Sequence, residues 1–322
     1  MKRSKELSRR DFLASTGMAA AGATLFPFRA LTSPARIRST DGPYEIIMAA
    51  AAVAKIDTHP LRGGIYVLEG SGGNIAAVPG KDGKLLIDAG ISVSKPQVSA
   101  ALNAINDDPI KHLINTHWHF DHTSGNAWLH EAGASICAHV NTRKHMAKTT
   151  RVDDWQHTFP ASPAAALPVT TFTSEKTVQL NGKTIRLHYY GPAHTDCDIC
   201  VHFQEDDVLH VADTWWNGLY PFIDYNTGGS IDGMIHATAK NIGLTTDKTS
   251  IICGHGPLGS RADMIEYHDM LTHMREKVAG LKRKGLSLQE TVAAKPSREF
   301  DPKWGQNVIG PDLFVRLVYK GV

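Results

Sequence analysis

Cysteine is scarce in this sequence, and its four cysteines, Cys137, Cys197, Cys200 and Cys253, show no disulfide framework. Cys197 and Cys200 have C-x-x-C spacing, but no thioredoxin-like strand–helix–strand pattern surrounds them. Residues three apart on a strand face opposite sides of the sheet, which argues against a local disulfide. We therefore expect buried thiols at these positions.

A strong net charge of either sign is also absent. The chain has 34 Lys and Arg against 32 Asp and Glu, a net charge of +2. Residues 1–35 carry six basic and two acidic residues, a net of +4, which leaves −2 for the remainder. This balance excludes a basic surface for nucleic acid. Apolar residues at 42% are typical of a soluble globular protein with a sizeable core.

Long apolar runs are missing beyond the N-terminal region, so no later stretch predicts a membrane-spanning helix. Ser8-Arg9-Arg10-Asp11-Phe12-Leu13, followed by an Ala- and Gly-rich stretch to Phe26, resembles a twin-arginine export signal. We expect residues 1–35 to be this signal peptide, with the export machinery as a partner. Residues 36–322 would then form one exported, periplasmic domain without stable membrane insertion.

Four metal-ligand residue types are concentrated in the run Thr116-His117-Trp118-His119-Phe120-Asp121-His122. In an extended segment His117 and His119 point the same way, because side chains alternate between faces. Asp121 and His122 follow where the chain must turn, so they can face a neighbouring point. Imidazole and carboxylate together suit zinc or a similar divalent metal, and two points favour two ions. The alternative is a His-rich surface loop.

Apolar, strand-like runs lead to this motif and to the other candidate ligands. Ile110–Asn115 runs directly into the motif, and Lys84–Ile87 ends at Asp88. Three later segments each deliver one ligand-type residue at or near the end of an apolar run: His194, Asp213 and His255.

These five segments, in this order, resemble the five motifs of the metallo-β-lactamase superfamily. The resemblance covers nearly all of the chain from about residue 44 onward. It implies an α/β fold, the αββα four-layer sandwich of the metallo-β-lactamase type, made of two halves at roughly 44–165 and 168–285. In that fold the ligands gather at strand ends between the halves.

The resemblance also implies a site. It assigns one metal ion to His117, His119 and His194, and a second to Asp121, His122 and His255, with Asp213 bridging. The expected cofactor is two zinc ions per chain, with a bridging hydroxide as nucleophile, because zinc lowers the pKa of its water to about 7. Asp121 is the expected catalytic residue that orients this nucleophile, and Asp88 supports a ligand rather than being one.

Two positions bear on the substrate. Asp213 stands where many zinc β-lactamases carry Cys or Ser, and with His122 it is similar to glyoxalase II and lactonases. In the third motif, Cys197 stands where the superfamily usually has glycine. Export, in contrast, favours lactams and lactones over cytosolic glutathione thioesters. We expect hydrolysis of a carboxyl-type bond in a small molecule, a cyclic amide or ester such as a β-lactam or lactone. The alternatives are a glyoxalase II-like thioesterase and a non-hydrolytic or iron-dependent member of the fold.

The substrate pocket is predicted less sharply. Side chains near the motifs that are able to line it are Trp118, Trp215, Trp216, Asn217 and Tyr220. Asn217 or Tyr220 could donate a hydrogen bond to an oxyanion, and the alternative for each residue is packing in the core or rim. Residues 141–172, which include Trp155 and Phe159, are either a lid or rim over the site or an ordinary surface loop.

Other local sequence patterns predict a linker, a hairpin and several helices. Residues 36–43 are predicted to be a polar linker, and residues 93–106 a helix. Gln179–Lys183 is a hairpin signal. Ser260 with Asp263, and Ser287 with Glu290, predict the starts of two C-terminal helices.

Overall fold

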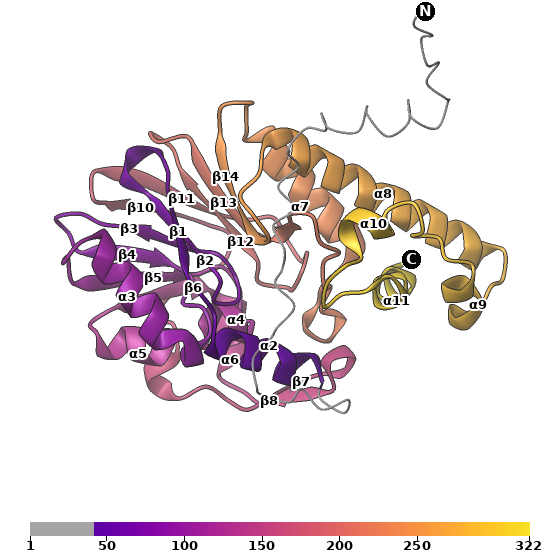
Figure 1. Ribbon diagram of the computed structural model, residues 1–322, viewed down its shortest axis with the longest axis horizontal. Coiled ribbons are helices and arrows are strands. Elements are labelled where there is room, and N and C mark those ends of the chain that lie inside the picture. Colours follow the sequence, from indigo (N-terminus) through magenta and orange to yellow (C-terminus); the bar gives the residue numbers. More distant parts are fainter. Residues whose placement is uncertain (1–41) are drawn as a thin grey trace, which may run out of the picture. The chain divides into compact units, whose positions relative to one another are not determined.

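Two β-sheets packed face to face form the centre of this computed structural model, which describes residues 42–322 (Figure 1). The expected signal peptide, and the predicted linker up to residue 41, lie outside the described residues. None of the described helices combines the length and the apolar character needed to cross a membrane.

The first sheet has seven strands in the described part of the chain, in the order β1-β2-β3-β4-β5-β6-β9. Its first four strands pair antiparallel, and β4, β5, β6 and β9 pair parallel. The strands are β1 (Asp57–Pro60), β2 (Tyr66–Glu69), β3 (Ile75–Val78), β4 (Lys84–Ile87), β5 (Ile110–Asn115), β6 (Ser135–His139) and β9 (Thr170–Phe172).

The second sheet has five strands over the same described residues, in the order β10-β11-β12-β13-β14, all antiparallel except the parallel pair β13 and β14. They are β10 (Glu175–Leu180), β11 (Lys183–Tyr189), β12 (Ile199–Phe203), β13 (Val208–Trp216) and β14 (Ser250–His255). The predicted hairpin joins β10 to β11, where Asn181 (φ 53°) and Gly182 (φ 74°) adopt the left-handed conformation that such turns need.

Strands β3 and β4 are buried at every position, and their residues are apolar except Lys84, whose ammonium donates to the carbonyl of Leu102 at 2.8 Å. Alternate side chains serve different cores: Ala76 and Val78 join the core between the two sheets, whereas Ile75 and Ala77 join the core on the other face. The sheet is therefore covered on both sides.

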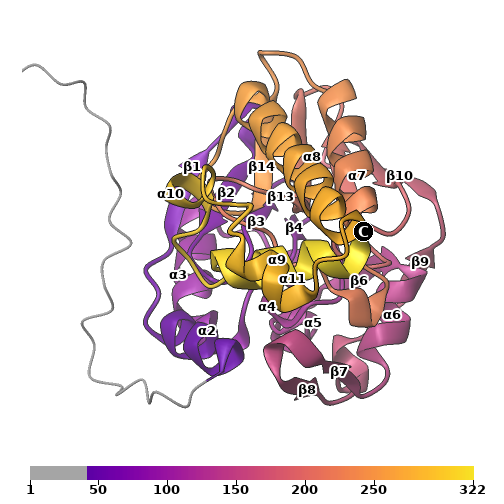
Figure 2. The ribbon, with the colours of Figure 1, turned by 90° about the vertical axis from the view of Figure 1, so that its right-hand side faces the viewer.

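Helices cover the outer face of each sheet (Figures 1 and 2). On the first sheet these are α3 (Lys95–Ile105) and α5 (Asn126–Glu131); on the second they are α7 (Ile231–Gly243), α8 (Arg261–Arg283) and α11 (Pro311–Gly321). This arrangement of helix, sheet, sheet and helix confirms the predicted αββα sandwich.

The remaining elements are short. The helices are α2 (Pro43–Ala52), α4 (Phe120–Thr123), α6 (Val140–Met146), α9 (Leu288–Ala293) and α10 (Asp301–Trp304). Single 3₁₀ turns are η1 (Arg62–Gly64), η2 (Ser92–Ser94), η3 (Asp153–Trp155), η4 (Ala164–Ala166) and η5 (Tyr225–Thr227). Strands β7 (Thr150–Val152) and β8 (His157–Phe159) form a separate hairpin.

Several local predictions are confirmed. The helices α8 and α9 begin with capping boxes at Ser260 and Ser287. All four cysteines are free thiols, three buried and Cys137 half-buried. The linker prediction is wrong at its last residue, because Pro43 is already helical: proline fits the first turn of a helix, where its missing N–H needs no partner.

Asn74, just before β3, ties the two sheets together. Its side-chain Nδ2 donates to the carbonyls of Cys253 and Gly256, each at 3.0 Å, and its backbone N–H donates to the carbonyl of Gly254 at 2.8 Å. The end of β14 is thereby fixed against the first sheet.

Candidate metal centre

The seven predicted ligands come from both halves of the fold. His117 and His119 follow β5 directly, and Asp121 and His122 lie in the short helix α4. From the second half come His194 in the loop after β11, Asp213 in β13, and His255 as the last residue of β14.

The structure brings six of the seven together in two groups of three, with Asp213 between them. In what we call the inner cluster, the ligand atoms of His117, His119 and His194 lie within 4.8 Å of one another. In the outer cluster, the same is true of Asp121, His122 and His255. The shortest approaches are 2.8 Å between His119 Nδ1 and His194 Nε2, and 3.2 Å between His255 Nε2 and Asp121 Oδ2.

Asp213 lies between the two clusters. One of its oxygens, Oδ1, is 3.1 Å from His122 Nε2, and the other, Oδ2, is 3.2 Å from His255 Nε2 and 3.3 Å from His194 Nε2. The same carboxylate therefore faces imidazoles of both clusters.

A loop after β13 anchors the inner cluster from behind. Asp224 Oδ2 accepts a hydrogen bond from His119 Nε2 at 3.0 Å, and the carbonyl of Phe222 accepts one from His194 Nδ1 at 2.7 Å. Asp224 is itself held by the hydroxyl of Thr227 at 2.6 Å. These bonds place the ring proton of each histidine on the outward nitrogen and leave the inward nitrogen free.

Asp88 anchors ligands in both clusters, as a support rather than as a ligand. It accepts hydrogen bonds from His122 Nδ1 at 2.7 Å, from the backbone N–H of Thr116 at 2.8 Å and from the Thr116 hydroxyl at 2.7 Å. Because that hydroxyl donates to Asp88, it can accept from His117 Nδ1, 3.1 Å away. This supporting role agrees with the prediction.

The three imidazoles of the inner cluster consequently direct unprotonated nitrogens at one another. Burial lowers the pKa of His117, and it lowers the pKa of His194 to about 4, so both rings are neutral at pH 7. His117 Nε2 is buried without a hydrogen-bond partner. Facing lone pairs repel one another unless a cation lies between them, and nitrogen with carboxylate oxygen suits divalent metals. The clusters are therefore able to hold metal ions.

The outer cluster has the opposite electrostatics. Burial by itself would lower the pKa of His255, but the carboxylates of Asp213 and Asp121 raise it to about 9. Against the same burial, Asp213, Asp121 and Asp88 raise the pKa of His122 well above its usual range. Burial also opposes the ionisation of Asp121, yet His122 and His255 lower its pKa to about 2.

Two residues with left-handed backbone and two glycines allow the candidate ligands to approach one another closely. Asp88 (φ 66°) and Ala212 (φ 47°) adopt the left-handed conformation, the latter at a bulge in β13 directly before Asp213. A side chain at Gly73 would overlap the ring of His122, and one at Gly254 would overlap Asp213. Glycine is therefore needed at positions 73 and 254 for this close approach.

The predicted pocket residues mostly belong to the core. Tyr220 is wrong as a pocket residue: its ring stacks on Phe314 at 4.2 Å and its hydroxyl donates to Asp301 at 2.9 Å. Trp215 is fully buried, and Trp118 is buried with its indole N–H donating to Thr227 at 3.0 Å. For these three residues the alternative of core packing holds.

Two of the candidates do lie beside the ligands. Asn217 donates its backbone N–H to the carbonyl of His255 at 2.9 Å and its side-chain amide to the carbonyl of Pro257 at 2.8 Å, so it holds the His255 segment. Trp216 is half-buried, with its ring 4.2 Å from that of His255. From residues 141–172, Trp155 lies 6.2 Å from His119, which agrees with a rim over the site.

Sequence reasoning did not single out Asp224 or Phe222. Asp224 is a lone acidic residue after an apolar run, 11 positions beyond Asp213, and the available signal was the turn chemistry of Asn226, Thr227 and Gly228.

Comparison with known proteins identifies the family. The sequence profile of the metallo-β-lactamase superfamily matches residues 68–256. The chain belongs to this superfamily. Its members and relatives are hydrolases, so the chain is an enzyme of hydrolase type with residues able to bind metal.

Within the superfamily, curated relatives match part of the chain. It is 29% identical over 165 residues to the 2,4-dinitroanisole O-demethylase subunit alpha of Nocardioides sp. (strain JS1661), covering 50% of this chain and 47% of that protein. It is 28% identical over 170 residues to the hydroxyacylglutathione hydrolase of Polaromonas sp. (strain JS666), covering 52% of this chain and 54% of that protein. The chain thus spans about half the length of the curated relatives that it matches.

Solved structures show the same fold at low identity. The inverting sec-alkylsulfatase Pisa1 from Pseudomonas sp. has a TM-score of 0.63 at 17% identity, over 85% of this chain and 51% of that one. A metallo-β-lactamase from Pontibacter korlensis has a TM-score of 0.54 at 15% identity, over 68% of this chain and 99% of the other.

Proposed function

We propose that this superfamily member is a two-zinc hydrolase that opens a cyclic amide or ester, such as a β-lactam or lactone. The observation that carries the proposal is the position of Asp213 between two clusters of three ligand-type residues each. Five imidazoles and two carboxylates form a donor set without thiolate, which suits a pair of zinc ions. Iron or manganese are the alternatives that elemental analysis must test.

The chain's own residues have separate tasks in this proposal. When bound, zinc supplies Lewis acidity and lowers the pKa of water to about 7. Asp224, Phe222 and Asp88 hold the imidazoles in the tautomers described above. Asp121 lies at the edge that solvent reaches, with 8% of its side chain exposed, and orients the attacking water by accepting its hydrogen bond. The water oxygen bonds to the carbonyl carbon as the ring C–N or C–O bond breaks, and a water proton passes to the leaving atom.

A glutathione thioesterase is the second candidate. It is favoured by the similarity to a hydroxyacylglutathione hydrolase and by the aspartate at position 213. The lactam or lactone proposal is favoured by the proposed export, because such rings reach the periplasm whereas glutathione thioesters are cytosolic.

Steady-state kinetics of the zinc-loaded protein separate these candidates. The panel contains lactams, lactones, glutathione thioesters and sulfate esters, and we expect the highest kcat/KM on a lactam or lactone. Efficient cleavage of glutathione thioesters with no cleavage of lactams or lactones would overturn the substrate proposal. Elemental analysis should give about two zinc ions per chain; one tightly held iron would contradict the metal proposal.

We also propose export by the twin-arginine route, on the basis of Arg9 and Arg10 before an apolar stretch. These residues lie outside the described part of the chain. Replacing both with lysine should leave the precursor in the cytoplasm, as seen by cell fractionation. Normal export of the double variant would mean that another route is used.

A further inference from the structure

Solvent reaches the metal centre along one edge. The side chains of His255, Asp121 and His119 are 16%, 8% and 7% exposed, whereas those of the other four candidate ligands are at most 2% exposed. A substrate must therefore approach the clusters at His255, Asp121 and His119. The side chains that surround these three residues are the ones able to select it.

Aromatic rings from three separate segments gather at this edge. We define the aromatic rim as Tyr44 of α2, Phe120 of α4, Trp155 of η3, and His157 and Phe159 of β8. Phe120 lies in the chain between His119 and Asp121, and its ring stacks on Phe159 at 5.5 Å and meets Tyr44 at 4.9 Å. Trp155 joins this rim to His119 at 6.2 Å.

The rim is not simply core. Tyr44, Phe120, His157 and Phe159 are half-buried, and only Trp155 is buried. At His255, the half-buried ring of Trp216 adds a further aromatic contact at 4.2 Å. Two of the three solvent-reached ligands thus contact an aromatic ring, and the third, Asp121, is the chain neighbour of Phe120.

Positive charge beside the rim is paired with carboxylates. Arg151 donates to the hydroxyl of Thr158 at 3.3 Å and pairs with Asp153 at 3.1 Å. Lys320 pairs with Asp154, the chain neighbour of Trp155. In the described part of the chain, Lys side chains lie over the rings of Trp128, Phe300, Trp304 and Tyr319, and no Lys or Arg lies over a rim ring. Among the described residues, the four carboxylates of the site form ion pairs only with histidines, and none pairs with a Lys or Arg. These carboxylates are Asp88, Asp121, Asp213 and Asp224. The charged partner of His157 is acidic, Glu45 at 3.9 Å.

From this combination we infer that the site recognises a carboxyl derivative through an uncharged aromatic group. Aromatic side chains bind aromatic ligands by burial and by offset or edge contacts. An anionic recognition group, such as the carboxylates of a glutathione conjugate, would meet the carboxylate of Glu45, while Arg151 and Lys320 already pair with acidic residues. This inference rests on the proposed function and narrows its substrate class to neutral aryl lactones, lactams or esters.

Matched lactones test the inference on the metal-loaded protein. γ-Phenyl-γ-butyrolactone should be cleaved with a kcat/KM about tenfold or more above γ-methyl-γ-butyrolactone, and a 4-carboxyphenyl analogue should lose most of that gain. Equal values for phenyl and methyl lactones, or a preference for the carboxylated analogue, would overturn the inference and leave the hydrolase proposal standing.

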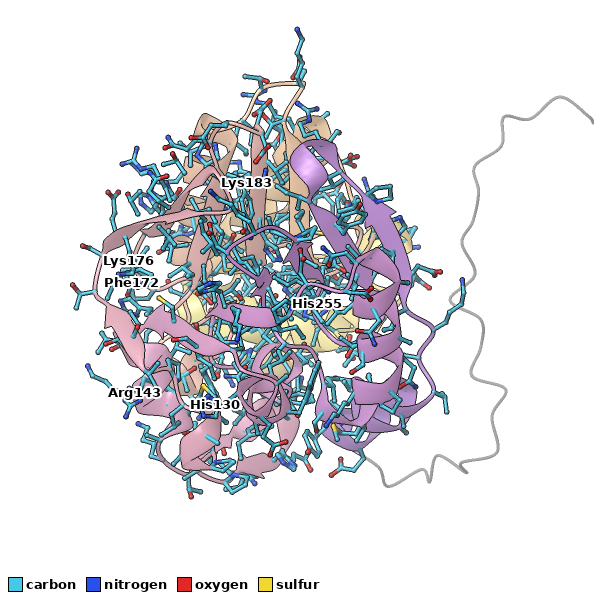
Figure 3. All side chains as sticks on the ribbon, turned by 90° about the vertical axis from the view of Figure 1, so that its left-hand side faces the viewer. His130, Arg143, Phe172, Lys176, Lys183 and His255 are labelled. Carbon is cyan, nitrogen blue, oxygen red and sulfur yellow. The ribbon has the colours of Figure 1, made fainter. Side chains whose placement is uncertain are left out.

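Variants locate the effect. Phe159→Leu and Trp216→Leu should each lower the phenyl-to-methyl ratio several-fold, with metal content unchanged. The matched control is Phe172→Leu, a half-buried phenylalanine at the end of β9 that lies well apart from His255 (Figure 3) and should leave the ratio unchanged. If the control lowers the ratio as much as Phe159→Leu and Trp216→Leu do, these aromatic rings are not the recognition surface.

A binding measurement keeps the test independent of catalysis. 3-Phenylcyclopentanone, a neutral ketone that cannot be hydrolysed, should bind at least about tenfold more tightly than 3-methylcyclopentanone by calorimetry. If that preference is present and no lactone, lactam or ester is cleaved, the hydrolase proposal fails while the recognition surface stands. Without the preference, the recognition surface fails.

Discussion

The inner and outer clusters are built from similar residue types but are held in different ways. Two imidazoles of the inner cluster bond to a buried carboxylate or carbonyl, and the third, His117, to a hydroxyl that Asp88 fixes. In the outer cluster only His122 has such an anchor, and His255 has none in the described part of the chain. The protein therefore preorganises the inner cluster, whereas the outer cluster depends more on its ion.

The largest effect is expected where the two clusters share a residue. Asp213→Ala should lower kcat/KM by at least about 10³-fold and should weaken metal binding at the outer cluster most, since it removes charge and geometry together. Steady-state kinetics and elemental analysis measure the two losses. Asp232→Ala, which breaks an exposed pair with Arg275, is the control and should change neither. Full metal content in the Asp213 variant would refute the shared role.

Asp224→Asn tests the anchoring of the inner cluster alone. The amide keeps the shape of Asp224 but removes the charge that fixes the His119 ring, so inner-site metal affinity should fall about 10- to 100-fold. Chelator competition measures the affinity, and ¹⁵N-histidine NMR reports the tautomer of His119. Asp88→Asn, in comparison, should affect both clusters because Asp88 holds His122 and, through Thr116, His117. Equal losses at both sites in the Asp224 variant would contradict this assignment.

Proton release should distinguish the clusters during metal binding. At pH 7 an ion entering the outer cluster must displace protons from His122 and His255, whose pKa values are raised, that of His255 to about 9. In the inner cluster His117 and His194 should release no proton at pH 7, because burial lowers the pKa of His117 and lowers that of His194 to about 4. Calorimetry in buffers of different ionisation enthalpy counts these protons. Release of equal numbers of protons on metal binding at the two clusters would contradict this prediction.

The raised pKa of His255 also makes the stability of the metal-free protein depend on pH. A histidine whose pKa is higher in the folded than in the unfolded protein stabilises the fold fully below about pH 6.5. For His255 that contribution is lost as pH rises through about 9. Urea unfolding of the metal-free protein should therefore show lower stability at pH 9.5 than at pH 6, with a smaller difference in His255→Gln.

The smallest effect is expected far from both clusters. Ser260→Ala removes the capping box of α8, so the free energy of unfolding should fall by about 1 kcal/mol. Metal affinity at both clusters should stay as it was. A loss of metal in this variant would mean that the clusters depend on the outer helices more than their local anchors suggest.

Residue types and their spacing were enough to predict which residues form the two clusters, because four of the five segments carry candidate ligands at or near a strand end and the fifth carries their support, Asp88. The same logic could not identify Asp224, which lies in an irregular loop without periodicity. Tyr220 was misassigned because its stacking partner, Phe314, lies 94 positions later, beyond any local pattern. The aromatic rim likewise depends on contacts between segments that are far apart in sequence, from Tyr44 to Phe120 and Phe159.

The hydrogen bonds of Asn74 to the end of β14 have a consequence for how the chain folds. They join positions 179 to 182 residues apart, and each cluster likewise takes two ligands from the first half and one from the second. Closing such long loops costs chain entropy and comes late in folding. Neither half alone holds a complete cluster. Metal uptake should therefore follow the docking of the two halves, and its rate would report the last step of folding.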